Sequence, residues 1–397
     1  MSASDFSRRG VLAAGLAATA APRFAFASVP TDKRLVIVLL RGAMDGLSAV
    51  PAFGDRDYQA ARNGIGTPPP GAGADAALDL NGFFGLSPAL RGLHGRYARG
   101  ELVVLHAIAS PYRDRSHFDG QNLLENGSAT PFGLADGWAN RSLAALPEAT
   151  RSGRKDLGIA IAPSMPLMMR GAAPVTSWSP SVLPAPSADL VARIRSMYEA
   201  GDPALARALV AAAEANGAAG PSARGDDAFA ALMGAAARFM TSPDGPCLAM
   251  VESTGWDTHA NQLGAFGVLS RNLAALDRGI DALAAGLGDR WRDTAVLVVT
   301  EFGRTVAMNG TRGTDHGTAG AAFLVGGAVK GGRVIADWPG LKPGDLHAGR
   351  DLKPTADLRS VMKAALVEHM GADPGLIERV VFPDSRAAPV LSGLFRG

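Results

Sequence analysis

Short and almost uninterrupted apolar runs alternate with helical segments along this chain. The run at residues 33–42, KRLVIVLLRG, is rich in valine, leucine and isoleucine and ends at a glycine. A helical pattern at residues 87–100 and a second apolar run at residues 101–109, ELVVLHAIA, follow it. Apolar runs of this length are typical of buried strands, and a strand, a helix and a strand in this order predict a parallel sheet. The predicted fold class is therefore α/β.

Four further apolar runs extend this pattern toward the C-terminus. They predict strands at residues 157–163, 247–253, 295–301 and 321–327. The segment at residues 164–245 is poor in strands and rich in alanine, and aspartates cap its helical stretches. It predicts a helical insertion that covers one side of the sheet. Helices are also predicted at residues 261–287 and 355–371, and residues 28–397 are expected to form a single domain.

The N-terminus has the features of an export signal. Arg8 and Arg9 precede a short apolar run of small residues, and AFA stands before Ser28. This combination predicts a twin-arginine signal at residues 1–27 that is cleaved after Ala27, although an amphipathic first helix is the ordinary structural alternative. No later run approaches the roughly 20 apolar residues of a membrane span. We therefore expect a periplasmic or secreted protein without a stable membrane span, and the twin-arginine translocase as its partner during export.

Charge and cysteine content exclude some kinds of site. The formal net charge is +2, and the basic residues are scattered along the chain, so we expect no nucleic-acid partner. Cys247 is the only cysteine, so neither an intramolecular disulfide nor a thiolate metal cluster can form. Any bound metal must be held by oxygen atoms and imidazole nitrogen atoms.

Polar clusters follow four of the predicted strands at the points where those strands end. They are Asp45, the segment from Arg113 to His117, the segment at residues 253–262, and the segment from Glu301 to His316. In an open α/β sheet, ligands usually bind at the carboxyl ends of the strands. Asp257 and His259 are separated by one residue, so in an extended loop both side chains leave on the same side and can share a metal. Glycines around Asp315 and His316 let the backbone bend, so that one or both reach inward.

Each of these residues also has an ordinary structural explanation. An aspartate after a strand is more often a helix cap or a turn residue than a ligand. The hypothesis of a site rests on coincidence, because the chain has only seven histidines and His117, His259 and His316 all fall at predicted junctions between a strand and a helix. Carboxylates and imidazoles without sulfur suit zinc, manganese, iron or magnesium, as one ion or as a pair.

Ser116 and Arg304 have two interpretations each. Ser116 is a good N-cap for a helix that Gly127 ends. A hydroxyl at a helix N-terminus near a metal is also suited to attack phosphorus or sulfur. Arg304 is suited to hold an anionic substrate, although an arginine after a strand is as often a surface salt-bridge partner.

A family resemblance emerges when these segments are taken together. The twin-arginine signal, RGAMDGLSAVPAF, RSHFDGQNLLENG, GWDTHANQ and EFGRTVAMNGTRGTDHG occur in this order over nearly the whole mature chain. The set resembles domain-of-unknown-function family 1501, a bacterial exported family grouped with the alkaline phosphatase and sulfatase superfamily. This resemblance implies an alkaline phosphatase-like domain with a mainly parallel sheet sandwiched by helices, two metal ions at the strand ends and a nucleophile that caps a helix.

The resemblance also implies roles for single residues. Asp45 resembles the bridging carboxylate after the first strand, and Ser116 resembles the nucleophile. Asp257 and His259 resemble the first of the late ligand pairs, and His316 resembles the final histidine of the superfamily.

The last of these segments departs from the superfamily pattern at one position. Glu301 falls where an Asp-His pair of the superfamily follows a strand, and Phe302 stands where the histidine of that pair would be. We expect Glu301 and His316 to converge with the other ligands in one small pocket, with Arg304 at its rim as an anion clamp.

The predicted function is that of an exported metal-dependent hydrolase of phosphate or sulfate esters, acting on an anionic small molecule or polymer. The alternative is a non-catalytic periplasmic binding or assembly protein on the same scaffold, which the phenylalanine at position 302 favours. The predicted metal ligands are Asp45, Asp257, His259, Glu301, Asp315 and His316. The predicted catalytic residues are Ser116, His117 and Arg304.

Overall fold

The computed structural model describes residues 32–396, except for residues 155, 182–185, 220–222, 224 and 265–266. The predicted export signal at residues 1–27 lies outside the described residues. Within the described part of the chain, no helix is both long enough and apolar enough to cross a membrane.

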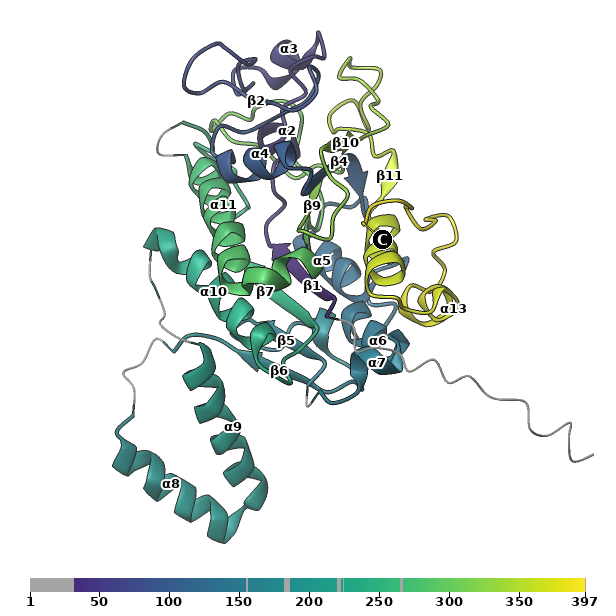
Figure 1. The fold of residues 1–397 in the computed structure, drawn as a ribbon. Helices are drawn as coiled ribbons and strands as arrows, with labels where there is room; N and C mark the ends of the chain where they lie inside the picture. The colour runs from purple at the N-terminus through teal and green to yellow at the C-terminus, as the bar shows by residue number, and fades with distance from the viewer. Residues whose placement is uncertain are drawn as a thin grey trace, which may run out of the picture.

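A mixed sheet forms the centre of the molecule (Figure 1). Among the described residues its nine strands are β1 (Arg34–Leu40), β4 (Leu102–Ala109), β5 (Gly158–Ile161), β6 (Val175–Trp178), β7 (Leu248–Ser253), β8 (Thr294–Thr300), β9 (Gly320–Val325), β10 (Arg333–Ile335) and β11 (Ala356–Asp357). Their order is β10-β4-β9-β8-β1-β7-β5-β6, and β11 pairs with β4. A separate hairpin consists of β2 (Leu78–Asp79) and β3 (Gly85–Leu86).

The central strand β1 confirms the prediction of a buried parallel strand. It pairs in parallel with both β7 and β8, and Ile37 lies opposite Met250 on one side and Leu297 on the other. All seven residues of β1 are buried. The predicted α/β class with a mainly parallel sheet is therefore confirmed.

Strand β9 is the exception to the parallel arrangement, because it runs antiparallel to both β8 and β4. The connection explains this difference. Residues 301–319, between β8 and β9, contain no helix, whereas a parallel return needs a crossover to the opposite edge of the sheet. The loop at residues 301–319 therefore begins and ends at the edge where β8 finishes.

Helices lie on both faces of the sheet (Figure 1). The α-helices are α2 (Gly46–Ala49), α3 (Tyr58–Arg62), α4 (Arg91–Ala98), α5 (His117–Asn126), α6 (Trp138–Ala145), α7 (Glu148–Arg151), α8 (Ala188–Gly201), α9 (Pro203–Ala219), α10 (Ala228–Thr241), α11 (Val268–Leu287), α12 (Leu358–Ala364) and α13 (Pro374–Leu376). The 3-10 helices are η1 (Leu167–Met169), η2 (Gly225–Asp227) and η3 (Gly288–Asp293). The π-helices are η4 (Ala365–His369) and η5 (Ile377–Val381).

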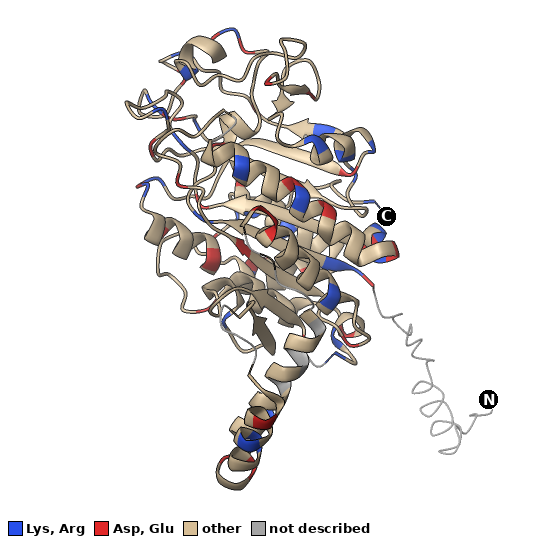
Figure 2. Cartoon of the chain, turned by 90° about the vertical axis from the view of Figure 1, so that its left-hand side faces the viewer, with Lys and Arg blue, Asp and Glu red and all other residues tan. Residues whose placement is uncertain are grey.

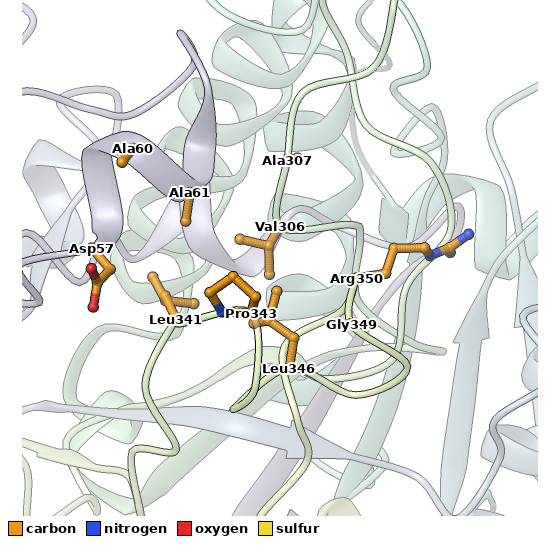
Figure 3. Close-up of a pocket in the computed structure, with 10 residues that line it drawn as sticks. All are labelled: Asp57, Ala60, Ala61, Val306, Ala307, Leu341, Pro343, Leu346, Gly349 and Arg350. Atoms are coloured by element: carbon orange, nitrogen blue, oxygen red, sulfur yellow. The ribbon is translucent and has the colours of Figure 1, made fainter.

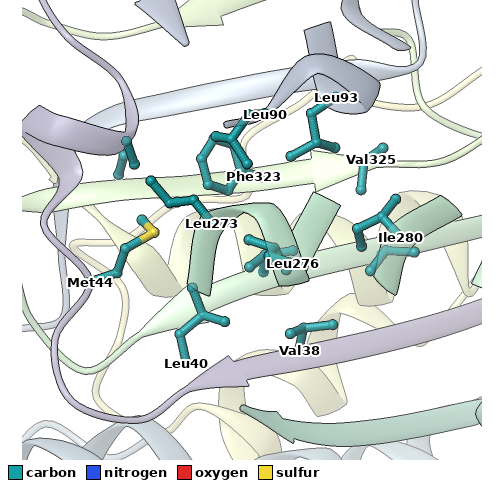
Figure 4. Close-up of a cluster of buried hydrophobic side chains, with 14 of the residues drawn as sticks. Val38, Leu40, Met44, Leu90, Leu93, Leu273, Leu276, Ile280, Phe323 and Val325 are labelled. Carbon is teal, nitrogen blue, oxygen red and sulfur yellow. The ribbon is translucent and has the colours of Figure 1, made fainter. Parts of the chain in front are cut away.

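The alternation of side chains along β1 divides the core into two layers. Val38 and Leu40 belong to the layer that contains Ile280 of α11, as Figure 4 shows. Ile37 and Leu39 belong to the opposite layer, which α6 and α12 close. Because successive strand residues point to opposite faces, one apolar run supplies both layers and needs helices on both sides.

The segment at residues 164–245 meets in part the expectation that it covers one side of the sheet, since its helix α10 packs against β5 and β7. Its strand β6 extends the edge of the sheet by pairing with β5, and α10 packs on α11. Helices α8 and α9 instead project away from the body of the molecule (Figure 1). Helix α8 buries none of its residues, and Figure 2 shows acidic and basic residues along this projecting arm.

Candidate metal centre

Polar side chains from distant parts of the sequence meet where the parallel strands end. The segments that follow β1, β4, β7 and β8 all leave this edge of the sheet, and β9 starts there. Hydrogen bonds connect them, since the Gly42 amide donates to Glu301 Oε1 at 2.9 Å and the Thr314 amide donates to the Thr258 carbonyl at 3.2 Å. The carboxyl edge of the sheet is therefore closed over by the loop at residues 301–319.

Three imidazoles direct their Nε2 atoms to one place on this edge. His316 Nε2 lies 3.0 Å from His117 Nε2 and 3.0 Å from His259 Nε2. Asp257 Oδ1 lies 3.4 Å from His117 Nε2, 3.0 Å from His259 Nε2 and 3.2 Å from His316 Nε2. The ligand atoms of His117, Asp257 and His316 all lie within 4.8 Å of one another, and His259 adjoins this set.

The other ring nitrogen of each histidine, Nδ1, contacts a separate oxygen atom. The contacted oxygen atoms are Glu301 Oε1 for His117 (2.7 Å), Asp315 Oδ1 for His259 (3.1 Å) and the Arg115 carbonyl oxygen for His316 (2.9 Å). Ionised carboxylates and carbonyls can only accept, so we assign the proton of each neutral imidazole to Nδ1. Each Nε2 then directs its lone pair inward, which is the arrangement in which histidines bind metals.

The donor set fits a divalent metal ion. Two Nε2 lone pairs that face each other at 3.0 Å repel unless a cation lies between them. Ligands bonded to an ion at about 2.0–2.2 Å are separated from one another by about 3.0–3.5 Å. The contacts of 3.0–3.4 Å between the nitrogens and Asp257 Oδ1 agree with that spacing. Three imidazoles and one carboxylate suit zinc, and also manganese or iron.

Glu301 supports His117 instead of joining the converging ligand atoms. Its Oε1 accepts hydrogen bonds from His117 Nδ1, the Gly42 amide and Gln121 Nε2, and its Oε2 accepts from Thr300 Oγ1. Burial would raise the pKa of Glu301, but the hydrogen bonds from His117 and Gln121 outweigh it and hold the pKa below its ordinary value. The structure therefore places Glu301 behind His117, whereas the sequence analysis expected it among the metal ligands.

Asp315 has a similar supporting position, on the exposed side of His259. Its Oδ1 accepts from His259 Nδ1 and from Asn309 Nδ2, both at 3.1 Å. The hydrogen bond from Asn309 and that from His259 lower the pKa of Asp315. Like Glu301, Asp315 orients an imidazole, whereas His316 beside it in sequence points to the centre.

Asp45 does not reach the cluster, contrary to the prediction that it is a ligand. Its carboxylate accepts from the amides of Leu47 and Ser48, from Ser48 Oγ and Gln262 Nε2, and from Arg62 Nη2 at 2.5 Å. Burial alone would raise the pKa of Asp45, but the charge of Arg62 outweighs this effect, so the pKa lies below its ordinary value. Asp45 caps α2 and neutralises a buried arginine, and these contacts saturate its oxygen atoms.

Arg304 is not at the rim of the site, where the sequence placed it. Its guanidinium is fully buried, and Nη1 donates to Asp257 Oδ1 at 2.6 Å. Nε donates to Thr314 Oγ1 at 3.2 Å, and Nη2 donates to the Thr314 carbonyl. Burial raises the pKa of Asp257, but the hydrogen bond and charge of Arg304 lower it to below its ordinary value.

Ser116 occupies the predicted N-cap position. Its hydroxyl accepts from the Asp119 amide at 3.5 Å, and Gly127 ends α5 in the left-handed conformation with φ 73°. His117 is the first residue of α5, so this cap sets the direction in which His117 enters the site. The helix boundaries predicted from Ser116 and Gly127 are confirmed.

Phe302 contacts the ring of His117, and Gln121 donates to the Glu301 carboxylate that orients this ring. The Phe302 ring stacks on His117 with centroids 5.0 Å apart and an interplanar angle of 27°. Gln121 was not singled out from the sequence, although it stands four residues after His117 on the predicted helix, and this spacing places the two on one helix face. Phe302 thus occupies the space against His117 and offers no further ligand.

A mostly apolar cavity adjoins the histidine cluster through Arg350. It has a volume of about 390 Å³ and includes Val306, Leu341, Leu346 and Arg350 in its lining. Figure 3 shows the apolar side chains grouped together and the Arg350 side chain extending away from them. The Arg350 guanidinium donates to the carbonyl oxygen of His316, so one residue contacts both the cavity and the histidine cluster.

The fold and the cluster define the class of this protein. It is a mainly parallel α/β sheet sandwiched by helices, with a candidate centre of three histidines and one aspartate at the carboxyl edge of the sheet. The chain belongs to the family described as "Protein of unknown function (DUF1501)", whose profile matches residues 110–381. The family resemblance inferred from the sequence motifs is thereby confirmed.

Solved structures with a similar fold include the following three bacterial proteins. A protein in the alkaline phosphatase superfamily from Vibrio parahaemolyticus is 10% identical, and the match covers 99% of this chain and 80% of that chain with a TM-score of 0.43. The lipoteichoic acid synthase LtaP from Listeria monocytogenes is 11% identical, and the match covers 89% of this chain and 75% of that chain with a TM-score of 0.41. The C-terminal periplasmic domain of EcEptC from Escherichia coli in complex with Zn is 10% identical, and the match covers 75% of this chain and 73% of that chain with a TM-score of 0.37. No curated protein matches this chain.

Proposed function

We propose that this protein is an exported, metal-dependent hydrolase of phosphate or sulfate esters. The observation that carries the proposal is the convergence of three imidazole Nε2 atoms on Asp257 Oδ1, each imidazole being oriented by a separate oxygen at Nδ1. His117, Asp257 and His316 would hold the ion, and His259 adjoins them as a fourth ligand. Neutral buried histidines that serve only packing do not need their lone pairs turned toward one another.

The ion, when bound, would supply a Lewis acid that polarises an ester oxygen and acidifies a nearby hydroxyl. We assign the nucleophilic hydroxyl to Ser116, which precedes the ligand His117 and stands at the N-terminus of α5, where backbone amides favour an anion. The Ser116 oxygen would form the new bond to phosphorus or sulfur as the alcohol oxygen leaves. Water would then release the acid and restore the serine.

Two arginines on the rim favour an anionic substrate. Arg115 Nη2 lies 2.7 Å from Asp351 Oδ2, and Arg350 Nε lies 2.9 Å from Asp351 Oδ1. One fully buried carboxylate thus pairs with two guanidinium groups, so this group of three side chains carries a net charge of +1. The side chains of Arg115 and Arg350 remain 27% and 46% exposed, so they can meet a phosphate or sulfate group that approaches from solvent.

The experiment measures metal content and ester hydrolysis on protein recovered from the periplasm. We expect bound transition metal, hydrolysis of phosphate or sulfate esters that a chelator abolishes, and loss of both metal and hydrolysis in His316→Ala. His347→Ala is the matched control, because His347 lies outside the cluster. Metal-free protein that binds no added zinc or manganese would overturn the proposal, and would favour the non-catalytic binding protein that Phe302 suggests.

A further inference from the structure

Asp257 Oδ1 is shared between the histidine cluster and a buried guanidinium. The three Nε2 atoms lie 3.0–3.4 Å from this oxygen, and Arg304 Nη1 approaches it to 2.6 Å. The Arg304 side chain has no exposed surface, and Thr314 fixes its two remaining nitrogens. A full positive charge therefore lies permanently beside the position that a divalent ion would take.

Four other carboxylates near this edge of the sheet are also committed to donors of the chain itself. Their partners are Arg62 for Asp45, His117 and Gln121 for Glu301, Arg115 and Arg350 for Asp351, and His259 for Asp315. A second divalent ion needs carboxylate oxygens, which are the usual hard ligands between neighbouring ions. Among the described residues of the cluster, Asp257 is the carboxylate that contacts the Nε2 atoms, and it is already paired.

We propose that the guanidinium of Arg304 takes the place of a second metal ion and restricts this centre to a single divalent cation. The inference rests on the proposed function in one respect, namely that the histidine cluster binds a divalent ion. It departs from the pair of ions that the family resemblance implied.

The physical reason is the charge that Arg304 cannot lose. An arginine stays protonated in proteins, so its charge is present whether or not the ion is bound. A second ion would have to displace the guanidinium from Asp257, leaving a buried charge unpaired, or accept its repulsion at short range in a medium of low dielectric constant. Arg304 is thus a positioning residue that orients Asp257 and lowers the affinity of the centre for cations.

The test titrates chelator-treated mature protein with zinc and, separately, with manganese, using calorimetry and elemental analysis. We expect the wild type to bind one equivalent of either ion. Arg304→Gln should bind that ion at least tenfold more tightly, because it removes the charge and keeps a side chain able to bond Thr314. Arg304→Lys should behave like the wild type. Arg193→Gln is the matched control, since it removes an exposed arginine of α8 that pairs with Asp189 and contacts no ligand.

The outcomes separate this inference from the proposed function. Two equivalents in the wild type would overturn the single-ion centre and leave the hydrolase proposal standing. No bound ion would overturn the hydrolase proposal itself. A folded Arg304→Gln protein with wild-type affinity for the ion would also reject the role of Arg304. Should the glutamine variant fail to fold, the same titration is made on Arg304→Met, which keeps the aliphatic stem.

Discussion

Replacing Asp45 with alanine distinguishes a structural carboxylate from a metal ligand. Asp45 and Arg62 are 1% and 0% exposed, and their Oδ2 and Nη2 atoms lie 2.5 Å apart. The substitution removes the only ion-pair partner of Arg62 among the described residues, and it also removes the acceptor for the first amides of α2. The variant therefore leaves a buried positive charge without its carboxylate partner.

The expected cost follows from that unpaired charge. Breaking a buried ion pair by removing one partner costs about 3–5 kcal/mol of the free energy of unfolding. For a chain of this length, a loss of that size lowers Tm by about 4–6 °C. The double variant Asp45→Ala with Arg62→Leu should recover part of the loss, because no buried charge is then left unpaired.

Chemical denaturation followed by circular dichroism measures the loss in stability, and zinc titration measures binding. We expect Asp45→Ala to be destabilised and to bind zinc with the wild-type stoichiometry. A variant that unfolds like the wild type but no longer binds zinc would refute the structural role and make Asp45 a ligand after all.

Four further predictions concern other parts of the chain. Burial lowers the pKa of His369 to about 4, below its ordinary value of 6.5, so its neutral form contributes stability above pH 6.5 that is lost as the pH falls toward 4. In His369→Gln, the loss of stability between pH 7 and pH 5, measured by urea denaturation, should be smaller by about 2 kcal/mol; an unchanged pH profile would contradict this. Ser116→Ala should abolish ester hydrolysis and cost about 0.5–2 kcal/mol of stability through the lost cap, whereas hydrolysis at the wild-type rate would leave Ser116 as a cap alone. Glu301→Gln should weaken zinc binding about 10–100-fold, because the carboxylate that orients His117 is lost; calorimetry showing wild-type affinity would exclude that role. Replacing Arg8 and Arg9 with lysine should keep the precursor in the cytoplasm, and processed protein in the periplasm of such cells, detected by fractionation, would disprove twin-arginine export.

Features that depend on residues close together in the sequence were predictable from it. The run at residues 33–42 contains β1, which is buried on both faces, because a strand with apolar side chains at every position can satisfy them only inside a sheet covered by helices. Ser116 and Gly127 marked the ends of α5, because capping is a contact between residues within one helical turn. The approach of Asp257, His259 and His316 followed from their places after strands that end at one edge.

The tertiary structure decided the direction of β9, and it decided which polar residues converge as candidate ligands and which support them. The return of the chain through residues 301–319 depends on the antiparallel pairing of β9 with β4 and β8, which no local pattern specifies. Asp45 and Arg304 each had several potential partners, and their choice depends on which opposite charge lies nearest once both are buried. An aspartate near a buried arginine gains more from pairing with it than from a more distant cation, because water no longer screens their charges. For that reason the sequence indicated which residue types gather at this edge, while packing determined that Asp45 binds Arg62, that Glu301 orients His117, and that Arg304 reaches Asp257.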